Sequence, residues 1–322
     1  MKKALSLLIL SLFANINATT QTTIIMTHGA NDSGSGWYKP GDHFLEEVAS
    51  QAALQFENAT LVPFSWKQPL NGITYLEILN GANDLANLII DLTQTETPTD
   101  IILVGHSFGG HVIKVASQFL NQAQAALTLE KITTNEQITN MPTQIDNELY
   151  KKLRASIQEK LSKITTKDNF SKEYLIDAAY TLGTPNVHYP EFLADMSVIG
   201  QFFNLYSDGD DVQDKVANKT VPEHERKVNL KIVIKEYDGA LTNPSHSGLT
   251  CESVGHRILS IPSFFEYADE QGDAFTFEKN GIITFPRNIG EEPVYKIDLN
   301  PVEEKYHWTC MPLTCAIPCI MT

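Results

Sequence analysis

The sequence predicts an α/β fold with a mostly parallel central sheet and helices on both faces. Two observations support this fold class. Short β-branched apolar runs alternate with longer segments whose apolar residues recur at helical spacing, as in strand–helix–strand units of a parallel sheet. The run Ile101–Val104 is apolar at every position, which fits a strand buried between two layers. A chain of 322 residues is long enough for one such domain with insertions.

The expected elements follow one another along the chain. We expect strands at 22–27, 60–66, 100–104, 174–182, 198–207 and 228–237, and helices at 44–56, 76–92, 111–120 and about 256–268. The alternation is interrupted at about 121–172, which is rich in Gln, Thr, Asn and Lys. We interpret that stretch as an insertion forming a helical cap, within a core domain that spans 19–274.

The insertion contains one amphipathic helix. Its apolar stripe is Leu149, Leu153, Ile157, Leu161 and Ile164. A helical excursion without a functional role is the alternative to a cap.

The first eighteen residues have the pattern of a secretory signal peptide. Lys2 and Lys3 precede an apolar run over 4–13, which is too short to span a bilayer, and small or polar residues continue to Ala18. The sequence therefore predicts export, into a periplasm or out of the cell. A buried first helix is the alternative interpretation.

The four cysteines fit an exported protein. Cys251 stands alone, whereas Cys310, Cys315 and Cys319 are close together near the C-terminus. Every complete pairing of the four joins Cys251 to that tail. We therefore expect 275–322 to be a C-terminal extension that packs on the core and is held there by disulfides.

Charge and composition disfavour several classes of partner. The formal net charge of −15 disfavours binding to nucleic acid. No segment after the first is long enough for a membrane span. Asp42 and His43 lack a second pair of ligands at metal spacing, so we expect neither a metal nor another cofactor.

The segment from Gly105 to Gly109, GHSFG, is a G-x-S-x-G motif between a predicted strand and a predicted helix. That setting is typical of a nucleophile elbow, in which a strained turn presents the serine hydroxyl above the sheet. Side chains at Gly105 and Gly109 would clash in so tight a turn. Ser107 is therefore the candidate nucleophile.

A serine nucleophile needs a base and an orienting carboxylate, which follow it along the chain in this fold logic. The predicted strand 198–207 ends in three acids, of which Asp210 is preferred, then Asp211, then Asp208. His246 follows the last predicted strand in a turn-rich loop. His256 is its competitor, and His224 precedes that strand. The expected oxyanion donors are the backbone N–H groups of Phe108 and Ala30.

Four segments, IIMTHGA, ILVGHSFGGHV, NLYSDGDDVQ and NPSHSGL, together resemble the α/β-hydrolase superfamily in its lipase and esterase-like branch. The resemblance covers roughly 22–268 apart from the insertion, which falls where this family has its cap. It implies Ser107 as nucleophile, Asp210 as acid, His246 as base, and Phe108 and Ala30 as oxyanion donors.

The activity implied is that of an exported serine esterase acting on ester or lipid-like small molecules. Acyl transfer, thioester or amide hydrolysis, or a non-catalytic binding role remain alternatives.

Overall fold

The computed structural model describes residues 20–29, 36–67, 75–94, 97, 99–121, 147–165, 173–186, 192–216, 219–222, 224–262 and 281–297. The expected signal peptide and the three cysteines of the tail lie outside the described residues. None of the helices in the described ranges combines the length and apolar character that a membrane crossing needs.

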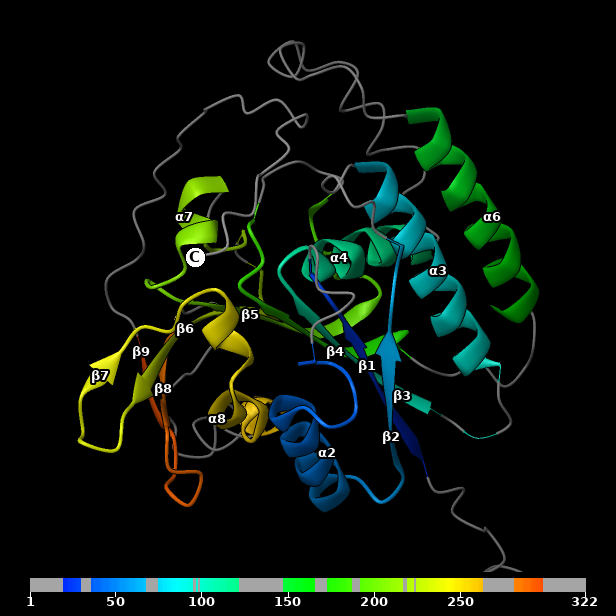
Figure 1. Ribbon diagram of the computed structural model, residues 1–322. Helices are drawn as coiled ribbons and strands as arrows, with labels where there is room; N and C mark the ends of the chain where they lie inside the picture. Colours follow the sequence, from blue (N-terminus) through cyan, green and yellow to red (C-terminus); the bar gives the residue numbers. More distant parts are fainter. Residues whose placement is uncertain are drawn as a thin grey trace, which may run out of the picture.

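One sheet organises the described part of the chain (Figure 1). Its strands are β1 (Gln21–Thr27), β2 (Ala59–Phe64), β3 (Thr99–His106), β4 (Ile176–Leu182), β5 (Ile199–Tyr206), β6 (Lys227–Lys235), β7 (Leu241–Thr242), β8 (Gly281–Pro286) and β9 (Val294–Ile297). The order is β2-β1-β3-β4-β5-β6-β8-β9, with β7 paired to β6. All neighbours from β2 to β8 are parallel, and only β7 and β9 join antiparallel. The prediction of a mostly parallel sheet is confirmed.

Helices cover both faces of this sheet (Figure 1). The layer on one face contains α3 (Tyr75–Thr93), α4 (Phe108–Leu120) and α6 (Asn147–Thr165). On the other face lie α2 (His43–Gln55) and the short α8 (Glu252–Gly255), which pack against each other. A further short helix, α7 (Asp211–Val216), follows β5.

The position of β3 in the centre of the sheet, between two layers of helices, explains why its sequence is continuously apolar. Successive side chains of a strand point to opposite faces of the sheet. Ile101 and Leu103 belong to the apolar core under α3, α4 and α6. Ile102 and Val104 belong to the core under α2 and α8. The two helix layers thus bury both sides of the strand that leads to Ser107.

The helix expected in the insertion is α6, and it packs on α3 and α4. Ile157 and Leu161 are buried in the core of that layer, and Leu149 and Leu153 are partly buried against it. Residues 122–146 of the expected cap lie outside the described residues.

Near the C-terminus, the expected helix differs in part, whereas the expected extension contributes strands. The chain forms α8 at Glu252–Gly255 and a 3-10 turn at Ile258–Ser260, and residues 261–262 are again helical. The remaining residues of the helix expected at about 256–268 lie outside the described residues. The backbone of Arg257 (φ −121°, ψ −11°) departs from helical values and separates α8 from the 3-10 turn. From the expected extension, β8 and β9 join the central sheet, with β8 parallel to β6.

Candidate active site

Ser107 lies in a sharp turn between β3 and α4. Its backbone has φ 53° and ψ −124°, and no other non-glycine residue in the described ranges has a positive φ. Such a conformation is strained for a residue with a Cβ. The turn is held by the Ser107 N–H, which donates to the carbonyl of Leu182 in β4 at 2.8 Å. The backbone therefore has the form expected of a nucleophile elbow.

The glycines on either side of Ser107 allow this turn. A Cβ on Gly105 would lie 2.7 Å from Cδ1 of Ile113 and 2.8 Å from the carbonyl carbon of Gly109. A Cβ on Gly109 would lie 2.7 Å from the carbonyl oxygen of His28 and closer still to that of Thr27. The prediction that side chains at both glycines would clash is confirmed. The first turn of α4 is consequently pressed against the end of β1.

Asp210 and His246 are brought together at the same edge of the sheet. Nδ1 of His246 lies 2.8 Å from Oδ2 of Asp210, whose side chain is completely buried. The other carboxylate oxygen accepts hydrogen bonds from the N–H groups of Val212 and Gln213, both at 3.0 Å. Since an ionised carboxylate can only accept, we assign the Nδ1 proton to His246, which leaves a lone pair on Nε2 of the neutral ring.

His246 is next to the elbow. Its ring centroid lies 4.6 Å from that of His106, the residue before Ser107, and its backbone carbonyl lies 3.0 Å from Nε2 of His106. A Cβ on Gly183, which follows β4, would be 3.1 Å from Nδ1 of His246. Within the described part of the chain, Ser107 Oγ and His246 are not hydrogen-bonded. Such contacts are often long before substrate binds.

The competing acids lie elsewhere. Asp208 forms ion pairs with Lys219 at 3.8 Å and, more closely, with Lys231. Asp211 is exposed at the first position of α7. Of the three neighbouring acids, Asp210 alone is hydrogen-bonded to His246.

The competing histidines also have other partners. His256 pairs through Nδ1 with Glu47 of α2, and Gln51 of the same helix lies 3.4 Å away. Nδ1 of His224 accepts the N–H of Arg226 at 3.1 Å. Burial, together with the nearby Lys227 and Arg226, lowers the pKa of His224 below its ordinary value.

Of the two residues expected to donate backbone N–H groups to the oxyanion, one lies within the described residues. Phe108 is the first residue of α4, where a backbone N–H has no partner within the helix and lies at the positive end of the helix dipole. Ala30 lies outside the described residues.

The segment just before Ala30 is held by His28, which is completely buried. Its Nε2 accepts the N–H of Trp66 at 3.2 Å, so Nδ1 carries the proton and donates to the Gly29 carbonyl at 2.9 Å. The indole of Trp66 stacks on the imidazole at 5.4 Å and donates to the His28 carbonyl at 2.9 Å. The sequence placed His28 in the loop expected to supply an oxyanion donor but gave its ring no role, whereas its two hydrogen-bonded ring nitrogens give it a positioning role.

Two further residues of the site were missed by the sequence analysis. The hydroxyl of Thr184 donates to the Ser107 carbonyl at 2.9 Å, and a Cβ on Gly110 would overlap that hydroxyl. Gly183 has φ +59° and lies against both Asp210 and His246. The available signal was the glycine directly after the predicted strand 174–182, since a glycine at a strand end often marks a close backbone approach.

His111, one turn along α4 from Ser107, is buried and has a pKa well below its ordinary value. Burial is the main cause, and the nearby Lys114 adds to it. His111 is therefore neutral at ordinary pH.

The described residues contain no group of three or more His, Cys, Asp or Glu side chains that could hold a metal ion. Asp42 instead caps α2, where its carboxylate accepts the Phe44 N–H at 3.0 Å.

The strand order, the helices on both faces and the elbow between β3 and α4 define an α/β-hydrolase fold. The predicted fold class is therefore confirmed. No protein-family model matches the sequence, and no curated protein matches it significantly.

Several solved structures are similar to the chain at low identity. They include a cutinase-like protein from Cryptococcus sp. (14% identity over 52% of this chain and 55% of that one, TM-score 0.30). They also include an acetylxylan esterase (14%, 63% and 87%, TM-score 0.33) and esterase B from Lactobacillus rhamnosis (13%, 83% and 65%, TM-score 0.31). The match thus spans about half the length of the cutinase-like protein. We assign the fold from the strand order and the elbow, and infer no substrate from these likenesses.

Proposed function

We propose that this protein is a serine hydrolase that cleaves carboxylic esters through Ser107, His246 and Asp210. The observation that carries the proposal is the 2.8 Å hydrogen bond between His246 and a completely buried Asp210, at the sheet edge where Ser107 occupies a strained turn. Strained backbone at a hydroxyl beside a carboxylate-oriented imidazole is the arrangement of nucleophilic catalysis.

In the proposed reaction, Ser107 Oγ attacks the ester carbonyl carbon while Nε2 of His246 takes the hydroxyl proton. Asp210 keeps the Nδ1 proton of His246 in place and stabilises the imidazolium that forms. The Phe108 N–H donates to the developing oxyanion, with Ala30 proposed as the second donor. His246 then protonates the leaving alcohol. A water molecule, deprotonated by His246, releases the acid from the acyl-enzyme and restores Ser107.

The test is labelling by a fluorophosphonate, which phosphonylates an activated serine. We expect the wild type to be labelled, Ser107→Ala to be unlabelled, and Ser260→Ala to be labelled like the wild type. Esterase activity towards p-nitrophenyl esters should fall by about 10⁴-fold or more in Ser107→Ala. A folded wild type that neither reacts with the probe nor cleaves any ester would overturn the proposal in favour of a binding role.

The same experiment distinguishes hydrolysis from acyl transfer. The two reactions share the acyl-enzyme and differ in whether water or another nucleophile accepts the acyl group. Adding a primary alcohol or a thiol to the ester assay should leave free acid as the main product if the enzyme is a hydrolase. A predominance of the new ester or thioester would instead assign a transferase.

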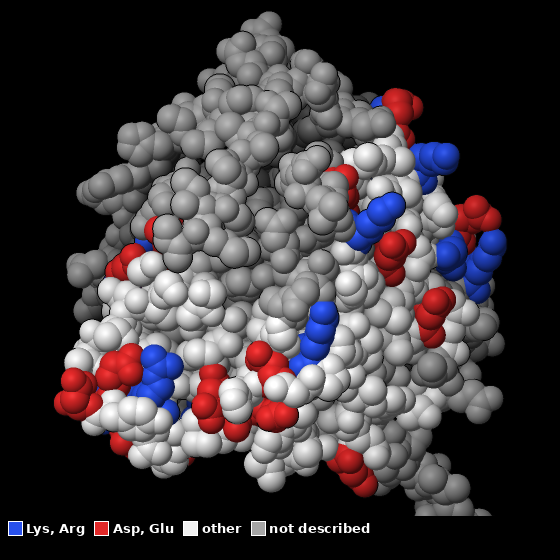
Figure 2. Space-filling view, viewed as in Figure 1, with Lys and Arg blue, Asp and Glu red and all other residues white. Residues whose placement is uncertain are grey.

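We also propose that the enzyme is exported and that its tail is joined by a disulfide to Cys251. Residues 1–18 have the signal-peptide pattern, and Cys251 is half-buried beside the core formed by α2 and α8. On the face shown in Figure 2, acidic and basic side chains of the described residues are interspersed. That mixture suits a small-molecule substrate better than a nucleic acid partner.

A further inference from the structure

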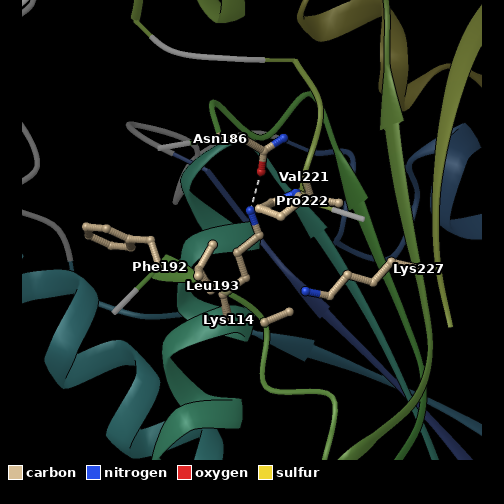
Figure 3. Close-up of a pocket in the computed structure, with 8 residues that line it drawn as sticks. Lys114, Asn186, Phe192, Leu193, Val221, Pro222 and Lys227 are labelled. Carbon is tan, nitrogen blue, oxygen red and sulfur yellow. Dashed lines mark hydrogen bonds between the residues drawn. The ribbon is translucent and has the colours of Figure 1, made fainter. Parts of the chain in front are cut away.

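A second cluster of ionisable side chains lies on α4, away from Ser107. Lys114 is about two helical turns beyond the elbow, and its side chain is buried. Its ammonium donates a hydrogen bond to Oδ1 of Asn186. Lys227, the first residue of β6, is half-buried and extends towards α4 (Figure 3). The two side chains therefore face the same pocket from different layers of the fold.

Both lysines line one small pocket (Figure 3). Its other walls include Asn186 and the apolar side chains of Phe192, Val221 and Pro222. The pocket thus combines two cationic groups with an otherwise mostly apolar lining. Repulsion from the Lys227 charge adds to the effect of burial in lowering the pKa of Lys114.

The amide of Asn186 is fixed in orientation, so the Lys114 ammonium keeps donors for another partner. Nδ2 of Asn186 donates to Oδ1 of Asn204 and to the Lys219 carbonyl, both at 3.1 Å. Its oxygen must therefore face Lys114, where it takes one of the three ammonium protons. Nζ of Lys227 makes no hydrogen bond or ion pair with a described residue.

Within the described part of the chain, neither ammonium forms an ion pair with a carboxylate, and the charge of Asp195 acts on Lys227 from a longer distance. Burial, and then Lys227, lowers the pKa of Lys114 to about 7. Burial also lowers the pKa of Lys227, against the opposing effect of Asp195. Asp195 itself is held by Asn121 at 2.5 Å and by Ser197 at 2.7 Å.

Among the described residues, the other ionisable groups near the pocket form no ion pair with either lysine. His111 on α4 is neutral at ordinary pH. The ammonium of Lys219, whose backbone follows α7, lies towards Asp208 at 3.8 Å. A buried cation without a directly paired counter-charge is costly, and a bound anion would reduce that cost.

We propose that this pocket binds one small monovalent anion, of the size of chloride, between the ammonium groups of Lys114 and Lys227. The bound anion would join α4, which carries Ser107 at its N-terminus, to β6 and to the segments around Phe192 and Val221. This proposal does not depend on the catalytic role of Ser107.

Anion binding at this pocket is coupled to protonation. Below pH 7 Lys114 is already charged and the anion binds without proton uptake. Above pH 7 the neutral amine must take up a proton on binding, so affinity falls by about tenfold per pH unit.

The test is a chloride titration of the full-length protein, in which sodium chloride replaces sodium isethionate at constant ionic strength. We expect Tm to rise and saturate at pH 6.5, and the half-saturating chloride concentration to increase more than about tenfold at pH 8.5. Broadening of the chloride NMR signal measures the same binding directly. An identical Tm in the two salts at pH 6.5, without broadening, would overturn the proposal.

Matched variants separate this pocket from general charge effects. Lys227→Gln should weaken chloride binding by at least about tenfold, because one of two charge-assisted contacts is lost. Lys235→Gln removes the same charge from the exposed end of the same strand and should bind chloride like the wild type. Equal losses in the two variants would contradict the assignment. Should Lys227→Gln not fold, crystals of the wild type soaked in bromide must show anomalous density between the two lysines, and its absence would count against the site.

Discussion

Two histidines that are close together in the sequence each bind a carboxylate, but the two pairs have different surroundings in the fold. In one, Nδ1 of His246 binds Asp210, and in the other, Nδ1 of His256 binds Glu47. The two histidine side chains are almost equally exposed, at 18% and 17%. The carboxylates differ, because Asp210 is 0% exposed and Glu47 is 21% exposed. Burial of the acid, and not of the histidine, distinguishes the two pairs.

The surroundings of each carboxylate explain that difference. Asp210 is in a loop at the sheet edge, fixed by two backbone N–H groups and next to the strand ends that hold Ser107. Glu47 projects from the middle of α2 and, with Gln51, holds the end of α8 against that helix. A histidine–carboxylate pair is therefore a structural contact in one place and a candidate catalytic relay in the other. The position of the elbow decides which is which.

The most severe test of this comparison is Asp210→Asn, which should lower kcat for ester hydrolysis by about 10⁴-fold. The backbone N–H groups of Val212 and Gln213 would retain the amide oxygen at the Oδ1 position. The amide NH₂ would then face His246 and force the proton onto Nε2, which could no longer accept from Ser107. Steady-state kinetics with a p-nitrophenyl ester measure this loss.

The matched change in the other pair is Glu47→Gln. Because Glu47 is partly exposed and distant from the elbow, kcat should stay within about twofold of the wild type and stability should change by less than about 1 kcal/mol. If Glu47→Gln and Asp210→Asn lose similar activity, the assignment of His246 over His256 is wrong.

A smaller effect is expected from Gly183→Ala. The new Cβ would stand 2.8 Å from Oδ2 of Asp210 and 3.1 Å from Nδ1 of His246, and would separate or rotate the pair. We expect kcat to fall by about 10- to 100-fold, as for small displacements of catalytic groups.

Gly239→Ala provides the control for backbone strain. Gly239 has φ +85°, and nothing lies within 4 Å of a Cβ there. Gly183→Ala and Gly239→Ala should each lose about 1 kcal/mol of stability, because alanine disfavours a positive φ. Gly239→Ala should nevertheless keep full activity. Equal activities would show that the Asp210–His246 geometry tolerates displacement.

The smallest expected effect is on the pH dependence of stability, and it comes from Lys114, a buried cation that is not paired with a carboxylate. Lys114 has a pKa of about 7 in the folded protein against an ordinary value of 10.5. Below pH 7, Lys114 is charged in both the folded and the unfolded protein, so its burial lowers the free energy of unfolding by the full amount. Between pH 7 and 10.5 the unfolded chain binds more protons than the folded one, so this contribution raises the free energy of unfolding by at most about 1.4 kcal/mol per pH unit.

Denaturant unfolding in chloride-free buffer at several pH values measures this slope. The stability of the wild type relative to Lys114→Met should increase with pH over that window. The difference between the wild type and Lys235→Met should be flat, because Lys235 is at the exposed end of β6. A flat difference for Lys114→Met as well would mean that Lys114 keeps its proton throughout.

Much of the fold followed from local sequence patterns. Apolar runs gave the strands of the parallel sheet, because a strand buried on both faces has no polar alternation. The amphipathic stripe of α6 was likewise visible, since helical periodicity is a local property. The end of α8 was not, because the break at Arg257 depends on how this segment packs against α2. Propensity alone does not report such contacts.

The site shows the same division. Ser107 was predictable, because the glycines that its turn needs are its neighbours in the sequence. His28, Thr184 and Lys114 were not recognised, because their partners lie far away along the chain, at Trp66, Ser107 and Asn186 respectively. No local pattern distinguishes a histidine that holds a loop from one that ends a strand.

By itself, then, the sequence determined which segments form strands and where the strained serine lies. Both depend on residues within a few positions of one another. It ranked Asp210 and His246 first but left three adjacent acids and three histidines to choose from. Only the tertiary structure pairs Asp210 with His246, turns Asp208 towards Lys231 and ties His256 to Glu47. The reason is physical: a loop side chain takes its direction from the strands and helices that pack around it, and those come from distant parts of the chain.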